Sequence, residues 1–247
     1  MNRRIVTTIA AKDLRLVLTR RSIRSSLIAF PLIVSVGLPL ITRFAGHRNG
    51  GQGIPASALP RILDSFGFFF VIGAALLPTA IATYSLVGEK VERSLEPLLA
   101  TPATDGEILL GKALAAALPP IGAIWLASVV FMTLTDAFTH DKLGRDYFPN
   151  ASILLVLLLV VPLAALGSVG FSVVVSSRVT DVRAGQQLGA LVVLPFTGLY
   201  VASETGAVTL DTAGLLVVAA VLAGLDLALG LLSRAVFRRE EILTRWS

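Results

Sequence analysis

Long apolar segments are the feature that most limits what this chain can fold into. Six apolar runs can be marked, at residues 25–41, 66–87, 113–134, 151–175, 188–202 and 213–233. A helix needs about 20 apolar residues to cross the hydrocarbon core of a bilayer. The second, third, fourth and sixth runs meet this length, whereas the first is short and the fifth is shorter. The pattern predicts an all-α polytopic membrane protein whose six transmembrane helices form a single domain over residues 1–247.

The composition agrees with a membrane protein and excludes several other classes. Hydrophobic residues make up 55% of the chain and charged residues 15%, with a mean hydropathy of +0.81. A soluble domain rarely carries so much apolar surface. The chain contains 0 cysteines, which excludes disulfides, thiolate metal sites and cysteine nucleophiles.

The distribution of basic residues predicts the orientation. A net charge of +5 and a pI near 10.1 are also typical of nucleic-acid-binding proteins. Most of the 21 Lys and Arg residues, however, lie in segments that six spans with an inner N-terminus would place in the cytoplasm. This positive-inside bias predicts a multi-pass protein of the cell (cytoplasmic) membrane, with both termini in the cytoplasm and with lipid rather than nucleic acid around it.

The N-terminal segment, residues 5–18, reads as an imperfect amphipathic helix. Its apolar residues align on one side and its basic residues on the other: Ile5, Ile9 and Leu16 against Arg4, Lys12 and Arg15. Asp13 interrupts the apolar sector. Two interpretations stay open, a helix lying in the cytoplasmic membrane interface and a plain basic anchor that fixes topology.

A polar segment, residues 89–112, separates the second and third apolar runs. As a helix, its first part places apolar and acidic side chains on different faces: Val91, Leu95 and Leu98 against Glu89, Glu92 and Glu96. Further on, Thr104 and Glu107 fit a capping box that would begin the third span. Such a segment can follow the membrane edge while it offers carboxylates to a soluble partner.

A nucleotide-binding motif in this region is incomplete. Residues 106–113, GEILLGKA, fit GxxxxGK, but Ala113 stands where a P-loop needs Ser or Thr for magnesium. No strand precedes the motif, and Ile108 onward reads as a helix entering the bilayer. The two histidines, His47 and His140, fall in predicted outer loops without metal-ligand spacing. We therefore predict no enzyme activity, no catalytic residue, no metal and no cofactor bound by this chain.

Four short sequences carry a resemblance to a known family. These are Gly88-Glu-Lys90, Glu92-Arg-Ser-Leu-Glu96, Leu98-Leu-Ala-Thr-Pro102 and Glu107-Ile-Leu-Leu-Gly-Lys112. Together they resemble the cytoplasmic signature between the second and third spans of type-2 ATP-binding-cassette (ABC) exporter permeases. The resemblance extends to the N-terminal helix, to the six spans and to Asp181-Val-Arg-Ala-Gly-Gln-Gln187, and so covers nearly the whole chain.

The resemblance implies a permease that pairs with a second copy of itself, or with a sister permease, and with two ABC ATPase subunits that bind the ATP and magnesium. It implies a cytoplasmic coupling helix that contacts the ATPase, with Glu89, Glu92, Arg93, Leu95, Glu96, Thr101 and Pro102 as coupling residues. Thr104 and Glu107 then cap the next helix, and Asp181, Arg183 and Gln186 lie in a second cytoplasmic loop. The alternative is that these charges merely solvate a loop.

Asp226 is an acid within a predicted span, and burying it in hydrocarbon costs about 2.5–3.5 kcal/mol on insertion scales. It either contacts a proton or cation along a transport pathway, as in sodium-specific extrusion, or accepts a hydrogen bond from a neighbouring helix or partner subunit. The short loop at 203–212 excludes a large outer domain, and its Glu204, Gly206 and Asp211 are candidates for short re-entrant elements.

Three functions remain after these observations. The first is the permease of an ATP-driven exporter, which couples hydrolysis by a separate subunit to substrate export. The second is a membrane scaffold that recruits cytoplasmic partners without transport. An ion-coupled secondary transporter ranks last, because such a protein needs charges in several spans.

Overall fold

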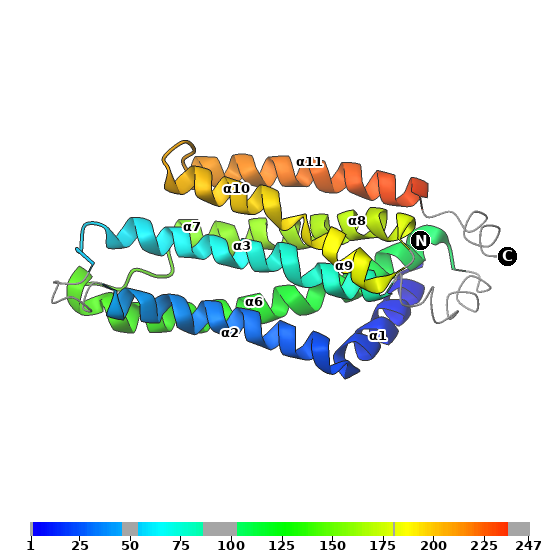
Figure 1. Ribbon diagram of the computed structural model, residues 1–247, viewed down its shortest axis with the longest axis horizontal. Helices are drawn as coiled ribbons and strands as arrows, with labels where there is room; N and C mark the ends of the chain where they lie inside the picture. The colour runs from blue at the N-terminus through cyan, green and yellow to red at the C-terminus, as the bar shows by residue number, and fades with distance from the viewer. Residues whose placement is uncertain (1, 46–53, 86–102, 180, 237–247) are drawn as a thin grey trace.

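The computed structural model is all-α in the residues that it describes, which are 2–45, 54–85, 103–179 and 181–236. In chain order the helices are α1 (Arg3–Thr19), α2 (Arg21–Phe44), α3 (Leu59–Thr83), α6 (Asp105–Leu143), α7 (Ala151–Leu155), the π-helical η2 (Val156–Val160), α8 (Val161–Arg178), α9 (Val182–Ala190), α10 (Val193–Glu204) and α11 (Thr212–Val236). They form an elongated bundle (Figure 1). The predicted fold class is confirmed.

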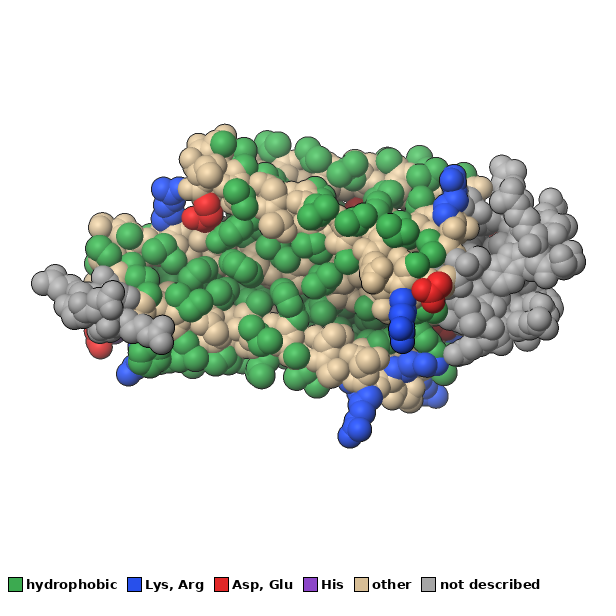
Figure 2. Space-filling view, in the orientation of Figure 1, with side chains coloured by type: hydrophobic (Ala, Val, Ile, Leu, Met, Phe, Trp, Pro, Cys, Tyr) green, Lys and Arg blue, Asp and Glu red, His purple; other side chains and the backbone are tan. Residues whose placement is uncertain are grey.

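Within the described residues, six helical stretches are long and apolar enough to cross a membrane: α2, α3, α6, α7 to α8, α9 to α10, and α11. The visible face of the molecule carries apolar side chains over its middle and charged side chains towards both ends (Figure 2). This distribution fits a protein whose middle lies in the hydrocarbon core of a bilayer and whose two ends face water. The chain is a multi-pass membrane protein.

The bundle has a basal end and a distal end. The basal end holds α1, the C-terminal end of α3 and the N-terminal end of α6 (Figure 1). It is the end that the basic residues predict to be cytoplasmic. The distal end holds the N-terminal end of α3 and the loop between α10 and α11. Between the two ends, α3 is the most enclosed span, because 78% of its apolar 18-residue stretch is buried inside the bundle.

Helix α1 meets α2 at a corner made by Arg20, whose backbone is extended with φ −80° and ψ 119°. The buried stripe of α1 consists of Val6, Ile9, Asp13 and Val17, and it packs against α6. The predicted helix is present, with Ile9 buried against the bundle and Leu16 49% exposed. The buried face is centred on Asp13, the residue that interrupts the apolar pattern.

Most spans are longer than their apolar runs. Helix α6 has 39 residues, about 58 Å at 1.5 Å per residue, so it extends well beyond a hydrocarbon core of about 30 Å. Polar flanking residues, which a hydropathy window leaves out, continue the helix into the interface. The fifth apolar run is short for the same reason. The polar helix α9 precedes the apolar helix α10, so the helical stretch covers 182–204, whereas the apolar run covers only 188–202.

Prolines explain two irregularities in the spans. Pro195 lacks the N–H that would bond to the carbonyl of Leu191, and the helix is interrupted at Leu191–Val192. Similarly, η2 ends directly before α8, which has Pro162 in its first turn. There the carbonyl of Leu157 accepts a hydrogen bond of 2.8 Å from Trp125 Nε1 on α6. A neighbouring helix thus satisfies a backbone group that would otherwise face hydrocarbon.

At the distal end, α10 continues to Glu204 and α11 begins at Thr212. The loop between them consists of turns and bends, with Gly206 in the left-handed region at φ 79°. It contains no helix of its own, so the candidate re-entrant elements are absent from this described loop. Its residues instead line a pocket described below.

Candidate functional site

The predicted coupling residues fall outside the residues that the structure describes. They are Glu89, Glu92, Arg93, Leu95, Glu96, Thr101 and Pro102. Both flanks of this segment are described, however: Tyr84 and Ser85 precede it, and Ala103 and Thr104 follow it. The contacts of these flanks show which helices are connected to the two ends of the segment.

The flank on the C-terminal side of the coupling segment begins with the capping box of α6. The Thr104 hydroxyl oxygen accepts from the Glu107 backbone N–H at 3.3 Å, and the Glu107 carboxylate accepts from the Thr104 backbone N–H at 3.0 Å. The two bonds satisfy backbone donors that a helix start leaves unpaired. They also fix the direction in which the chain enters α6.

Glu107 does more than cap its own helix. Its other carboxylate oxygen accepts a hydrogen bond from the backbone N–H of Asn2. Asn2 is itself the N-cap of α1, since its side chain accepts from the Arg4 N–H at 3.1 Å. One buried carboxylate, only 4% exposed, therefore joins the starts of α1 and α6.

A buried polar cluster joins α1, the end of α3 and α6 one turn deeper. Lys112 Nζ lies 3.0 Å from Asp13 Oδ2 and donates to Ser85 Oγ at 3.1 Å and to the Ser85 carbonyl at 3.3 Å. Ser85 Oγ donates in turn to Asp13 Oδ2 at 2.9 Å. Both charged side chains are 3% exposed. We call Asp13, Ser85 and Lys112 the basal cluster.

The basal cluster was missed by the sequence predictions, although a signal for it exists. Asp13 is the acid on the apolar side of an amphipathic helix, and Lys112 lies at the start of an apolar span. Each charge would be costly to bury alone, but the two can be buried together because an acid and a base form an ion pair. Pairing the two anomalies would have placed α1 against α6.

Close backbone packing supports the same junction. A Cβ on Gly111 would lie 2.9 Å from Ile9 Cβ and 3.1 Å from the Val6 carbonyl oxygen, closer than ordinary contacts allow. Glycine at this position therefore lets α1 lie directly on α6. On the preceding flank, the Arg20 guanidinium lies 3.9 Å from the centre of the Tyr84 ring, a cation–π contact.

The second predicted loop also lies at the basal end. Asp181 caps α9, because its carboxylate accepts from the Ala184 N–H at 3.0 Å. Arg183 is exposed and Gln186 is half-buried, whereas Gly185 and Gly189 are buried where α9 packs on α3 and α8. The structure thus places Arg183 where a soluble partner can reach it. It does not bring Arg183 or Gln186 into the basal cluster.

Asp226 lies apart from this junction, on α11 against α8. Neither of its carboxylate oxygens has a hydrogen-bond partner, although both are buried. A Cβ on Gly167 of α8 would lie 2.6 Å from Asp226 Oδ1, so the carboxylate fills the space that the glycine leaves. The hydrogen bond to a neighbouring Ser or Thr, one of the two interpretations of this residue, is absent among the described residues.

The GxxxxGK sequence forms the first turns of α6. Its backbone N–H groups beyond the first turn therefore point along the helix to carbonyl groups, an arrangement that differs from a phosphate-binding loop. Among the described residues, no three His, Cys, Asp or Glu side chains converge as metal ligands would.

Comparison with known protein families gives a match that covers most of the chain. Residues 54–222, more than half of the chain, match the model of a family described as ABC-2 family transporter protein. This range begins before α3 and ends within α11, so it contains both flanks of the coupling segment. No curated protein matches the chain.

Proposed function

Since this chain belongs to the ABC-2 transporter family, as a membrane-spanning permease of an ABC transporter, we propose that it is the permease of an ATP-driven exporter. In this proposal, separate ABC ATPase subunits hydrolyse ATP and push on residues 89–102. This chain supplies the pathway through the cell membrane. A second copy, or a sister permease, completes the pathway.

One observation carries the proposal, namely that buried contacts tie both flanks of residues 86–102 to each other and to α1. Ser85 and Lys112, on opposite sides of the segment in sequence, are hydrogen-bonded at 3.1 Å, and both contact Asp13. A force on the segment therefore acts on α1, α3 and α6 together. Buried, hydrogen-bonded groups of this kind resist separation, because each would be left unpaired at a cost of several kcal/mol.

The chemistry of the segment fits an ATPase partner. As a helix, it would present Glu89, Glu92 and Glu96 to basic residues of the ATPase, while Val91, Leu95 and Leu98 pack. When the ATPase subunits close on nucleotide, they would draw the two coupling segments of a permease pair together. The linked spans would then tilt from an inward-open to an outward-open arrangement.

The test is a double substitution in the coupling segment. The permease with its cognate ATPase, reconstituted in vesicles, would be compared with Glu92→Ala plus Leu95→Ala for complex formation, ATP hydrolysis and transport. We expect weaker association and loss of nucleotide-dependent transport. Lys142→Ala, an exposed change at the distal end of α6, is the matched control and should leave all three unchanged.

Two results would overturn the proposal. The first is unchanged transport in the double variant. The second is a stable complex with the ATPase that shows no nucleotide-dependent flux of any cargo, which would support the membrane scaffold instead.

A further inference from the structure

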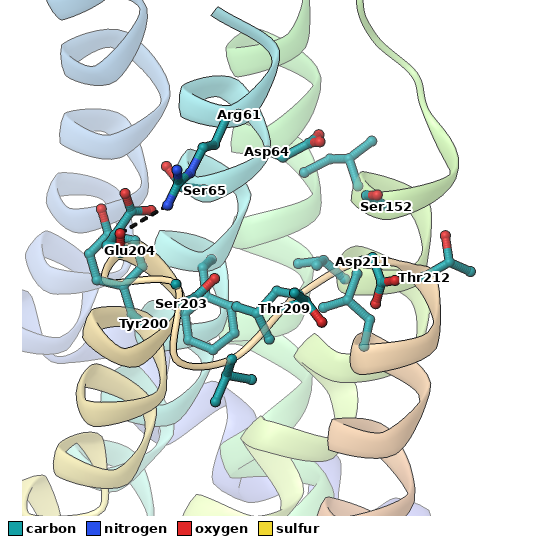
Figure 3. A pocket seen from close by; sticks show the side chains of 17 residues that line it. Arg61, Asp64, Ser65, Ser152, Tyr200, Ser203, Glu204, Thr209, Asp211 and Thr212 are labelled. Carbon is teal, nitrogen blue, oxygen red and sulfur yellow. Dashed lines mark hydrogen bonds between the residues drawn. The ribbon is translucent and has the colours of Figure 1, made fainter. Parts of the chain in front are cut away.

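The distal end contains a pocket that the coupling proposal does not use. Its volume is about 540 Å³, and it lies between the first turns of α3, the α7–η2 segment, the end of α10 and the loop that leads to α11 (Figure 3). Pockets for small molecules typically measure about 300–1,000 Å³. This pocket therefore has the size of a small-ligand site, formed within one copy of the chain.

The inner wall of the pocket is apolar and partly aromatic. Phe68, Ile153 and Leu215 line it and are each 2% exposed. The Tyr200 ring stacks on Phe68 with the ring centres 6.2 Å apart and an interplanar angle of 17°. The stacking holds Tyr200 in place beside the pocket. Such a wall favours an apolar group and offers π-faces to a cation.

The mouth of the pocket is acidic. Three carboxylates, those of Asp64, Glu204 and Asp211, line it with one guanidinium, that of Arg61. Arg61 donates to the backbone carbonyl of Glu204 at 2.9 Å, so its hydrogen bond goes to the main chain (Figure 3). None of the three carboxylates forms an ion pair within the part of the chain that the structure describes.

Two of the three carboxylates, those of Asp64 and Asp211, are held in place by neutral donors. Asp64 accepts from Asn150 Nδ2 at 3.0 Å, and Asp211 accepts from the Gly214 backbone N–H at 2.8 Å. Neutral donors position a carboxylate without cancelling its charge. Outside the pocket, burial and then the neighbouring Asp64 carboxylate raise the pKa of the Tyr147 hydroxyl, while Arg145 lowers it.

We propose that this pocket binds a small organic cation, an amine or a quaternary ammonium ion that carries an apolar group. The apolar group would enter between Phe68, Tyr200 and Leu215, and the cationic centre would lie at the acidic mouth. Anions are disfavoured by the excess of carboxylates. A bare metal ion fits poorly, since no three acidic or histidine side chains among the described residues converge on one point.

The inference is independent of ATP coupling, because the start of α3 and the α10–α11 loop, which line the site, lie at the end of the bundle opposite α1 and the start of α6 (Figure 1). The test is accordingly made without nucleotide. The full chain with its ATPase, in lipid nanodiscs, is titrated by isothermal calorimetry with benzyltrimethylammonium, and empty nanodiscs correct for partition into lipid. We expect saturable binding of one cation per permease. Benzenesulfonate, which has a similar ring and the opposite charge, should not bind.

Substitutions in the mouth test where the cation binds. Glu204→Gln removes one charge from an exposed side chain, and we expect the dissociation constant to rise about tenfold, the change that corresponds to about 1.4 kcal/mol. Asp64→Asn should have an effect in the same direction. Asp141→Asn is the matched control, because Asp141 is an exposed distal acid that does not line the pocket.

Tyr200→Leu tests the aromatic wall. It keeps an apolar side chain and removes the π-face, so we expect the dissociation constant to rise by about 2- to 30-fold, the range of a cation–π contact. Thermal unfolding of each variant shows whether the fold is intact. Equal affinity in the pocket variants and in Asp141→Asn would overturn the proposal. So would equal binding of benzenesulfonate, or binding no greater than to empty nanodiscs.

Discussion

Lys112 contacts three oxygens from two other helical segments: Asp13 Oδ2, Ser85 Oγ and the Ser85 carbonyl. It is an ammonium group at 3% exposure, so polar groups of the protein, rather than water, stabilise its charge. At this scale, each charge stands out in the sequence, but the sequence predictions did not pair the two. Which two anomalies meet depends on the angle at Arg20, which turns α1 back against α6, and no local pattern encodes that angle.

The first prediction concerns this pair. Lys112→Met leaves the Asp13 carboxylate buried without a cation, and we expect it to lower the free energy of unfolding by about 3–5 kcal/mol. The double variant Asp13→Leu plus Lys112→Met removes both charges and should recover most of that loss. Thermal unfolding in detergent, followed by the fluorescence of the purified chain, measures both. If the double variant is no more stable than Lys112→Met, the pair is not the source of the loss.

The second prediction concerns Asp226. Because its buried oxygens have no partner among the described residues, Asp226→Leu removes an acid that costs about 2.5–3.5 kcal/mol to place in hydrocarbon. We expect the single chain to become more stable to heat. If the carboxylate serves transport of a proton or cation, flux through the reconstituted complex should fall in the same variant.

Gly167→Ala is the companion change, since its methyl group would displace the Asp226 carboxylate without removing it. A role in transport predicts that flux falls in Gly167→Ala as well. Unchanged flux in both variants would contradict a pathway role and leave a contact with the partner permease as the explanation for Asp226.

At the scale of elements, the helices and their starts were largely predictable, because their signals are local. The capping box at Thr104 and Glu107 is present as the pattern predicts. The ends of the spans were predicted less well, because hydropathy detects the hydrocarbon-facing part of a helix and not its polar continuation. The burial of Asp13 on α1 was not predicted, because an acid is costly to bury alone and its cation, Lys112, lies 99 residues further along the chain.

The third prediction compares two glycines of α6. Gly111→Ala places a methyl group against Ile9 and the Val6 carbonyl, whereas a Cβ on Gly122 meets nothing within 4 Å. We expect Gly111→Ala to destabilise the chain by about 1–3 kcal/mol through overpacking. Gly122→Ala should be neutral or stabilising by up to about 1 kcal/mol, because Ala favours a helix over Gly. Thermal unfolding separates the two, and equal effects would contradict the close packing of α1 on α6.

At the scale of the whole molecule, the apolar runs and the family resemblance led to the correct fold class and family. The pocket at the distal end was beyond sequence reasoning. Asp64, Tyr200 and Asp211 come from three separate elements, and only the packing of α3 beside α10, and of α11 on α7 and η2, brings them to one cavity. The coupling residues, including Glu92 and Leu95, remain predictions.

The fourth prediction concerns orientation in the membrane. Since the chain contains 0 cysteines, a single introduced cysteine gives an unambiguous label. Thr209→Cys, in the distal loop, should react with a membrane-impermeant maleimide in intact cells. Arg183→Cys, exposed at the basal end, should react only after the membrane is opened. The reverse pattern would place the basal end outside and would contradict an ATPase partner in the cytoplasm.

The contact between Asp13 and Lys112 also has a consequence for biogenesis. The two residues are 99 positions apart, so at translation rates of about 5–20 residues per second Asp13 leaves the ribosome roughly 5–20 seconds before its cation. During that interval the first helix has no buried partner for its acid and must stay in contact with water. It docks only when the third span has emerged. The N-terminus is thus the first part of the chain to be synthesised, but it reaches its final position only after the third span.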